Sequence, residues 1–173
     1  PARAHALLPS VKLIALLREP AARAYSQYQH SVKQGWETLP FEQALRAEAE
    51  RLQGEEEKLL ADPSYRSFAH QHQSYVARGR YLVQLERWAT HYVWSQILVI
   101  SSERFYTDPA SALSTTFEFF GLDGADVGPF EIHNASAYAE AIDPQLLTNL
   151  RHAFREDNER LFSSLGDDLE WER

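Results

Sequence analysis

The sequence predicts an α/β fold with a central parallel sheet flanked by helices, in which helix makes up most of the 173 residues. Two short and almost uninterrupted apolar runs, Val11–Leu17 and Gln96–Ile100, are typical of strands covered on both faces. Short buried strands that alternate with helices indicate a parallel sheet, and two strands are too few to complete one. We therefore expect the remaining strands to come from sequence missing from this chain or from another chain.

Helix signals follow the first predicted strand. Pro20 suits a first helical turn, because its missing N–H needs no partner there, and the helix that it opens ends at about Gly35. A second helix is predicted to begin near Thr38 or Leu39 and to run to about Leu60. Proline at its start supports this assignment.

Three further helical segments precede and follow the second predicted strand. Phe68–Trp94 carries apolar residues at three- and four-residue steps, which predicts a long helical region with one apolar stripe. Asp108–Gly121 and Asp143–Gly166 each open with a capping aspartate followed by proline and end at a glycine. The length and the lack of an internal repeat indicate that residues 1–173 form one domain, or a large part of one.

Composition excludes several classes of function. The chain has no cysteine, which excludes disulfides, thiolate zinc sites and cysteine nucleophiles. Its net charge of −8 disfavours nucleic acid as a partner. No apolar run approaches the roughly 20 residues needed to span a membrane, and no signal peptide is present, so we expect a soluble, cytoplasmic protein. His70 and His72 lack a third ligand nearby in the sequence, so no metal site is expected.

Polar side chains gather where the first predicted strand ends. Arg18 follows the strand directly, Ser26 lies on the next helix, and His30 is one turn further on the same helix face. Ligands of open α/β sheets bind beyond the carboxyl ends of the strands, and Arg with Ser can hold a phosphate. The residues alone leave open a strand-end salt bridge for Arg18 and a backbone-bonded helix serine at Ser26. Arg23 is interpreted as part of a structural ion pair.

The segment Lys12–His30, KLIALLREPAARAYSQYQH, resembles the 3′-phosphate-binding segment of sulfotransferases that use 3′-phosphoadenosine-5′-phosphosulfate (PAPS). That family has a strand, an Arg, a Pro two residues on and a Ser eight residues after the Arg, and this sequence keeps Arg18, Pro20 and Ser26. Over most of the chain, the order of later motifs resembles the bacterial and heparan-type branch. These motifs are Gly79-Arg80-Tyr81, Gln84-Leu85, Trp88, the second apolar run, Glu103, Asp108-Pro109, Phe119–Leu122, Asn158, Leu161, Gly166 and Trp171.

The resemblance implies a P-loop-type sulfotransferase fold and transfer of a sulfuryl group from PAPS to a hydroxyl or amine, with no metal. It implies that Arg18 and Ser26 bind the 3′-phosphate. His30 matches a position near the acceptor in heparan-type N-sulfotransferases, which makes it the candidate general base; the alternative is a histidine that only orients a neighbour or the cofactor. The acidic balance disfavours a highly sulfated polymer, so a small-molecule or carrier-bound hydroxyl or amine acceptor is expected. The sequence carries no signal for the oligomeric state.

The sequence departs from that family in two places. No glycine is followed by Ser or Thr, so the Lys-x-Gly-Ser/Thr-Ser/Thr loop that holds the 5′-phosphosulfate is absent. We therefore expect a C-terminal portion of the domain that carries the 3′-phosphate-binding half and is inactive alone. Asp123–Ala137 also lacks the Lys or Arg that many relatives place over the 3′-phosphate, which leaves Asn134, Ser136 or backbone groups as substitutes.

Two other classes of protein remain open from the residues. A nucleotide-binding, kinase-like P-loop relative would need a phosphate loop and a magnesium ligand, and neither is found in the sequence. A non-enzymatic helical interaction module would not need Arg18, Pro20 and Ser26 in register at a strand end.

Overall fold

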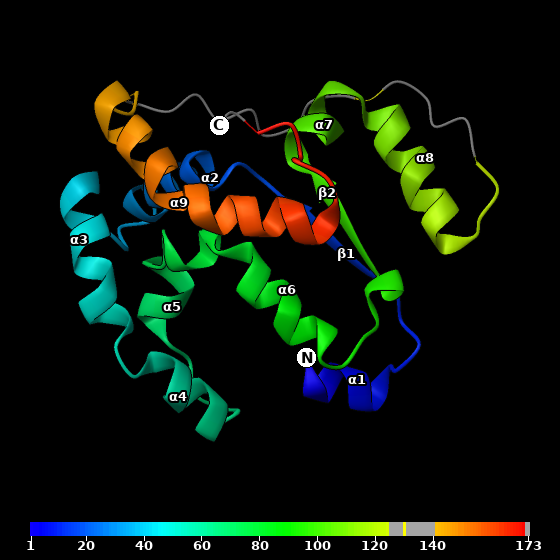
Figure 1. Ribbon diagram of the computed structural model, residues 1–173. Coiled ribbons are helices and arrows are strands. Elements are labelled where there is room, and N and C mark those ends of the chain that lie inside the picture. Colours follow the sequence, from blue (N-terminus) through cyan, green and yellow to red (C-terminus); the bar gives the residue numbers. More distant parts are fainter. Residues whose placement is uncertain (125–129, 131–140, 172–173) are drawn as a thin grey trace. The chain divides into compact units, whose positions relative to one another are not determined.

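Two parallel strands form the sheet. In the computed structural model, which describes residues 1–124, 130 and 141–171, β1 (Leu13–Leu17) pairs with β2 (Ile97–Ser101), with Leu13 opposite Ile97. Figure 1 shows the two strands running side by side although they lie far apart in the sequence. Both strands lie where the apolar runs predicted them, and helix dominates the rest of the described chain. The predicted α/β class with a parallel sheet is therefore confirmed.

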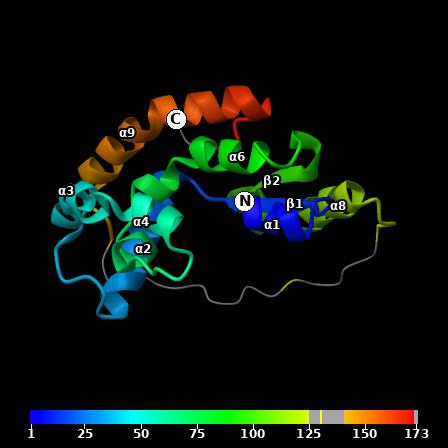
Figure 2. The ribbon, with the colours of Figure 1, turned by 90° about the horizontal axis from the view of Figure 1, so that it is seen from below.

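Only one face of β1 is packed within the described part of the chain. Alternate residues of Leu13–Leu17 belong to a core that includes α6 (Tyr81–Ala89), which lies along the sheet in Figure 2. Ile14 and Leu16 on the opposite face are 44% and 50% exposed. The prediction that this strand is covered on both faces is therefore wrong for β1. Successive strand side chains point to opposite faces, and helices of the described residues pack on one of them.

By its internal contacts the chain divides into two compact units. The first unit contains Pro1–Glu19, Tyr81–Ala137 and Glu156–Arg173, and the second contains Pro20–Arg80 and Tyr138–Arg155. The helix α9 (Pro144–Leu165) contributes its early turns to the second unit and its later turns to the first. The assignment of residues 1–173 to a single domain stays a prediction.

The first unit contains several short helices besides the sheet. Besides α6, these are α1 (Ala2–Leu7), the 3-10 helix η2 (Trp94–Gln96), α7 (Ser102–Thr107) and α8 (Pro109–Phe120). Its buried core consists of Leu17, Tyr81, Leu82, Leu85, Tyr92, Ile97, Leu161, Leu169 and Trp171. The carboxylate of Asp108 accepts the amide of Ser111 at 3.1 Å, and Gly121 ends α8 with a φ of 72°. The predicted order of cap, proline and terminal glycine is confirmed for this helix.

The regular elements described in the second unit are all helices. It contains α2 (Pro20–Lys33), α3 (Phe41–Leu52), α4 (Glu55–Ala61), α5 (Phe68–His72), the 3-10 helix η1 (Ala77–Gly79) and the first turns of α9. Its core consists of Ala21, Ala24, Tyr25, Phe41, Ala44, Tyr75, Leu150 and Phe154. Asp143 caps α9 as predicted, since its carboxylate accepts the amide of Leu146 at 2.8 Å.

Two of the predicted helices are interrupted. The helix expected to run to Leu60 is divided into α3 and α4, because Gly54 between them has a φ of 73°, in the left-handed region that glycine adopts readily. The helical region expected over 68–94 is divided into α5, η1 and α6. There the carboxylate of Glu48 accepts the amides of Val76 and Ala77, both at 2.8 Å, in place of helical carbonyls. A side chain distant in sequence thus redirects the backbone.

Gly79 ends η1 at a point where no side chain fits. A Cβ at this position would lie 2.7 Å from two ring atoms of Phe154 and 3.2 Å from the side chain of Pro20. Because Phe154 is fully buried, we expect Gly79→Ala to lower the free energy of unfolding by about 2 kcal/mol, measured by urea denaturation. Gly124→Ala is the control, since nothing lies within 4 Å of a Cβ there. Equal losses of stability in the two variants would contradict the predicted clash.

Candidate functional site

Arg18 lies in the first unit, directly beyond the last residue of β1. The peptide group that follows it, formed by the carbonyl of Arg18 and the amide of Glu19, is held at both of its polar atoms. The hydroxyl of Tyr81 donates to the carbonyl of Arg18 at 2.8 Å, and the amide of Glu19 donates to Oε1 of Glu103 at 2.9 Å. Arg18 itself is half-buried. Arg18 is thus a cationic residue at the carboxyl end of a parallel strand, and the peptide group that follows it is fixed by two side chains distant in sequence.

The carboxylate of Glu103 accepts several hydrogen bonds at this strand end. Its Oε2 accepts the indole N–H of Trp171 at 3.0 Å and the hydroxyls of Ser101 and Ser102 at 3.1 and 3.2 Å. Burial alone would raise the pKa of Glu103, but hydrogen bonds from the Glu19 amide, from its own amide and from Trp171 outweigh burial and lower the pKa below the usual range. Glu103 is therefore a charged acceptor at neutral pH.

Ser26 and His30 both lie on α2, in the second unit, and their i, i+4 spacing places them on one helix face. Ser26 is half-buried and His30 is exposed. The imidazole of His30 makes an edge contact with the indole of Trp36 at 5.5 Å between ring centroids, and Trp36 in turn packs on His72 at 3.9 Å. The imidazole of His30 is thus accessible from solvent beside an indole.

The predicted convergence of Arg18, Ser26 and His30 involves both units. Arg18 is described within the first unit, and the other two residues within the second. Their meeting at one phosphate stays a prediction.

Arg23 has a structural role on α2. Its guanidinium donates to the carbonyl of Tyr75 at 2.5 Å and to that of Ser74 at 3.4 Å. These two acceptors are backbone carbonyls, and the ion pair that the sequence suggested stays a prediction. Nearby, the hydroxyl of Ser31 donates to the carbonyl of His72 at 2.6 Å. These two side chains tie α2 to the segment that includes the end of α5.

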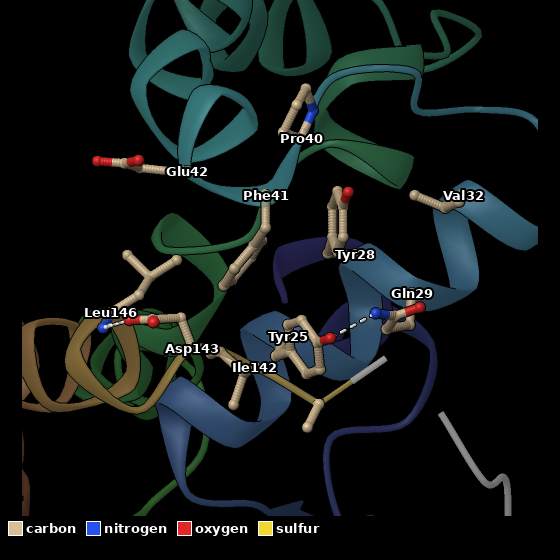
Figure 3. A pocket seen from close by; sticks show the side chains of 11 residues that line it. Tyr25, Tyr28, Gln29, Val32, Pro40, Phe41, Glu42, Ile142, Asp143 and Leu146 are labelled. Carbon is tan, nitrogen blue, oxygen red and sulfur yellow. Dashed lines mark hydrogen bonds between the residues drawn. The ribbon is translucent and has the colours of Figure 1, made fainter. Parts of the chain in front are cut away.

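A pocket of about 470 Å³ opens in the second unit, among α2, the start of α3 and the start of α9 (Figure 3). Its residues are Tyr25, Tyr28, Gln29, Val32, Pro40, Phe41, Glu42, Ala141, Ile142, Asp143 and Leu146. Tyr28 and Phe41 lie 4.8 Å apart between ring centroids, and the amide of Gln29 donates to the hydroxyl of Tyr25 at 2.6 Å. Among the described residues this lining contains two carboxylates and no Lys, Arg or His, and these residues suit an apolar or aromatic group better than an anion.

Ser26 and His30 are not among the described residues that line the pocket. On α2 the pocket is lined by Tyr25, Tyr28, Gln29 and Val32, and at about 100° per residue Gln29 lies only about 60° from Ser26. The pocket and the predicted site residues therefore occupy adjoining parts of the helix surface.

Other sequence predictions concern the rest of the site. Asn134 and Ser136 lie outside the described residues. Within residues 1–124, 130 and 141–171, no group of three His, Cys, Asp or Glu side chains is arranged to hold a metal ion. No helix in that part of the chain is both long and apolar enough to cross a membrane.

Tyr81 and Glu103 are parts of the family resemblance in the sequence, which predicts no role for either residue. The structure brings both to the Arg18–Glu19 peptide. The only local signal was the position of Glu103 just after the second apolar run, at the same sheet edge as Arg18.

Comparison with known proteins shows which family the chain resembles. A family model described as "Sulfotransferase domain" matches residues 2–145. The chain is 34% identical over 128 residues to "Bifunctional heparan sulfate N-deacetylase/N-sulfotransferase 1" of Xenopus laevis, and 31% identical over 125 residues to "Bifunctional heparan sulfate N-deacetylase/N-sulfotransferase 2" of Bos taurus. These alignments cover 72% and 70% of this chain and 13% of each relative.

A solved structure is similar over nearly the whole chain. The sulfotransferase from Alicyclobacillus acidocaldarius matches with a TM-score of 0.75 at 28% identity. The match covers 97% of this chain and 60% of that one. The chain thus has the fold of part of a larger sulfotransferase structure.

Proposed function

The chain belongs to the sulfotransferase domain family, and from that premise we propose that it acts in the transfer of a sulfuryl group from PAPS to a hydroxyl or amine acceptor. The observation that carries the proposal is the placement of Arg18 beyond β1, on a peptide group held by Tyr81 and Glu103. The motif that resembled the family's 3′-phosphate segment thus coincides with a strand end and with the start of α2.

In this proposal Arg18 and Ser26 bind the 3′-phosphate of the nucleotide. A guanidinium supplies charge and a fork of donors, and a hydroxyl supplies one directed donor, which together suit a phosphate. PAPS supplies the activated sulfuryl group when it is bound. The half-burial of both side chains fits a role in which each contributes a partly desolvated contact to an anion.

His30 is the proposed general base. It accepts the proton of the acceptor hydroxyl or amine while that oxygen or nitrogen attacks sulfur. The bond between sulfur and the phosphate oxygen breaks in the same step, and 3′-phosphoadenosine-5′-phosphate leaves with the electron pair. Exposure of the imidazole leaves room for an acceptor beside it.

The proposed acceptor is a small-molecule or carrier-bound hydroxyl or amine. The printed names of the relatives refer to heparan sulfate. The net charge of −8 and the carboxylates of the aromatic pocket favour a neutral or basic acceptor over a polyanion. We further propose a cytoplasmic location and a need for a 5′-phosphosulfate loop, which this sequence lacks, before turnover occurs.

Isothermal titration of the chain with three nucleotides tests the proposal. We expect 3′-phosphoadenosine-5′-phosphate to bind at least about 10-fold more tightly than adenosine 5′-monophosphate, because a charge-assisted phosphate contact is worth that much. Adenosine 2′,5′-bisphosphate is the control, since it has the same charge with the phosphate on the neighbouring oxygen. Equal affinities for all three nucleotides would remove the proposed function.

A further inference from the structure

We propose that Tyr81 and Glu103 are positioning residues for Arg18, an inference that rests on the proposed function of Arg18 in binding the 3′-phosphate. The two side chains hold one peptide group from its two ends. Tyr81 donates to the Arg18 carbonyl at 2.8 Å, and Glu103 accepts from the Glu19 amide at 2.9 Å.

The position of this peptide group explains why side chains are needed. The last pair in the β1–β2 register is Leu17 with Ser101, so the Arg18–Glu19 peptide lies just past the ladder. In a trans peptide the carbonyl and the N–H point in opposite directions, so it needs a donor on one side and an acceptor on the other. Tyr81 of α6 and Glu103 of α7 supply these two partners.

Holding the peptide plane sets the direction of the Arg18 side chain. The plane fixes ψ of Arg18 and φ of Glu19, and the Cα–Cβ bond of Arg18 follows from that backbone. Tyr81 and Glu19 are only 8% and 6% exposed, so water competes little for these hydrogen bonds. An arginine whose Cα–Cβ bond is fixed in this way loses less freedom when it binds an anion than one on a free strand end does.

Trp171 connects the two positioning residues. Its indole N–H donates to Oε2 of Glu103 at 3.0 Å, and its ring packs on that of Tyr81 with 5.9 Å between centroids. Trp171 is 5% exposed. One tryptophan therefore orients the acceptor of Glu103 and supports the ring of Tyr81 at the same time.

Tyr81→Phe tests the inference, because it removes the hydroxyl and keeps the ring. We expect the affinity for 3′-phosphoadenosine-5′-phosphate to fall about 5-fold, with the affinity for adenosine 5′-monophosphate changing by less than about twofold. The effect should vanish in an Arg18→Ala background, since it acts through Arg18. Glu103→Leu should act in the same direction, and Glu103→Gln, which keeps one acceptor oxygen, should recover part of the lost affinity.

Tyr75→Phe is the matched control. Tyr75 is fully buried, and its hydroxyl donates to Oε2 of Glu37 at 2.9 Å in the second unit. Loss of this hydroxyl should lower the melting temperature. It should leave unchanged the ratio of the affinity for 3′-phosphoadenosine-5′-phosphate to that for adenosine 5′-monophosphate.

The possible outcomes separate this inference from the proposed function. The deciding quantity is the ratio of the affinity for 3′-phosphoadenosine-5′-phosphate to that for adenosine 5′-monophosphate. If this ratio falls in Arg18→Ala and is unchanged in Tyr81→Phe, only the positioning role is overturned. The same holds if Tyr75→Phe lowers the ratio as much as Tyr81→Phe does. A ratio near one in the unmodified chain overturns the proposed function, and the positioning role with it.

Discussion

Replacing Arg18 by alanine is expected to weaken the binding of 3′-phosphoadenosine-5′-phosphate by about 10- to 100-fold, the effect of losing charge-assisted hydrogen bonds to a phosphate. Binding of adenosine 5′-monophosphate should change little, because that nucleotide lacks the 3′-phosphate. Isothermal titration of both nucleotides measures the difference. The reason for a large effect is structural: Arg18 is half-buried at a strand end, where its charge is screened less than on an open surface.

Two variants control for general effects of charge. Arg18→Lys keeps the charge and loses the planar fork of donors, so it should recover only part of the affinity. Arg46→Ala removes an equivalent charge at an exposed site, where Arg46 pairs with Glu42. If Arg46→Ala weakens binding as strongly as Arg18→Ala does, the result reflects net charge, and the assignment of Arg18 to the 3′-phosphate is wrong.

Glu37→Gln is expected to lower the free energy of unfolding by about 3 kcal/mol at neutral pH. Glu37 is 4% exposed. Its carboxylate accepts the amides of Thr38 and Leu39 at 2.9 and 3.0 Å, the hydroxyl of Tyr75 at 2.9 Å, and both terminal nitrogens of Arg51 at 2.5 and 3.1 Å. The neutral side-chain amide of the Glu37→Gln variant cannot form the ion pair, and it places an N–H donor beside the guanidinium of Arg51.

The same carboxylate makes stability depend on pH. Burial alone would raise the pKa of Glu37, but the hydrogen bonds from Arg51, the Leu39 amide, Tyr75 and the Thr38 amide lower it to about 2. A pKa lowered in the folded state contributes stability above the ordinary value of 4.5, and the contribution is lost as pH falls toward 2. We expect the difference in the free energy of unfolding between the unmodified chain and Glu37→Gln to shrink to less than about 1 kcal/mol at pH 2.

Urea denaturation at several pH values between 2 and 7 measures this window. Other carboxylates with lowered pKa values, such as Glu55 beside Lys58, are present in both proteins and cancel in the difference. Glu42→Gln is the control, because its pair with Arg46 is exposed and should cost less than about 0.5 kcal/mol. A Glu37→Gln loss that does not depend on pH would show that the charge of Glu37 is unimportant.

Several elements were predictable because their causes are contiguous in the sequence. The two apolar runs became β1 and β2, and the aspartate–proline pairs at 108–109 and 143–144 start α8 and α9. Such signals depend on side-chain period and on capping within a few residues. The spacing of Arg18, Pro20 and Ser26 is also local, which is why the family resemblance could be stated before any fold was known.

Two predictions that were wrong, an unbroken helical region over 68–94 and a β1 strand covered on both faces, have a common physical origin. The break between α5 and α6 follows from the carboxylate of Glu48, which takes the amides of Val76 and Ala77. The exposed face of β1 depends on which helices pack on the sheet. Neither cause lies within the segment whose structure was predicted, so no local pattern reported it.

By itself the sequence determined the strand, the arginine, the helix that follows and the family to which that order belongs, because each depends on neighbouring residues. Only the tertiary structure decided what holds the Arg18–Glu19 peptide. Its partners Tyr81 and Glu103 are 63 and 84 positions away from the groups that they bind. The hydrogen-bonding needs of a peptide past a strand end can be anticipated, but folding alone selects the side chains that meet them.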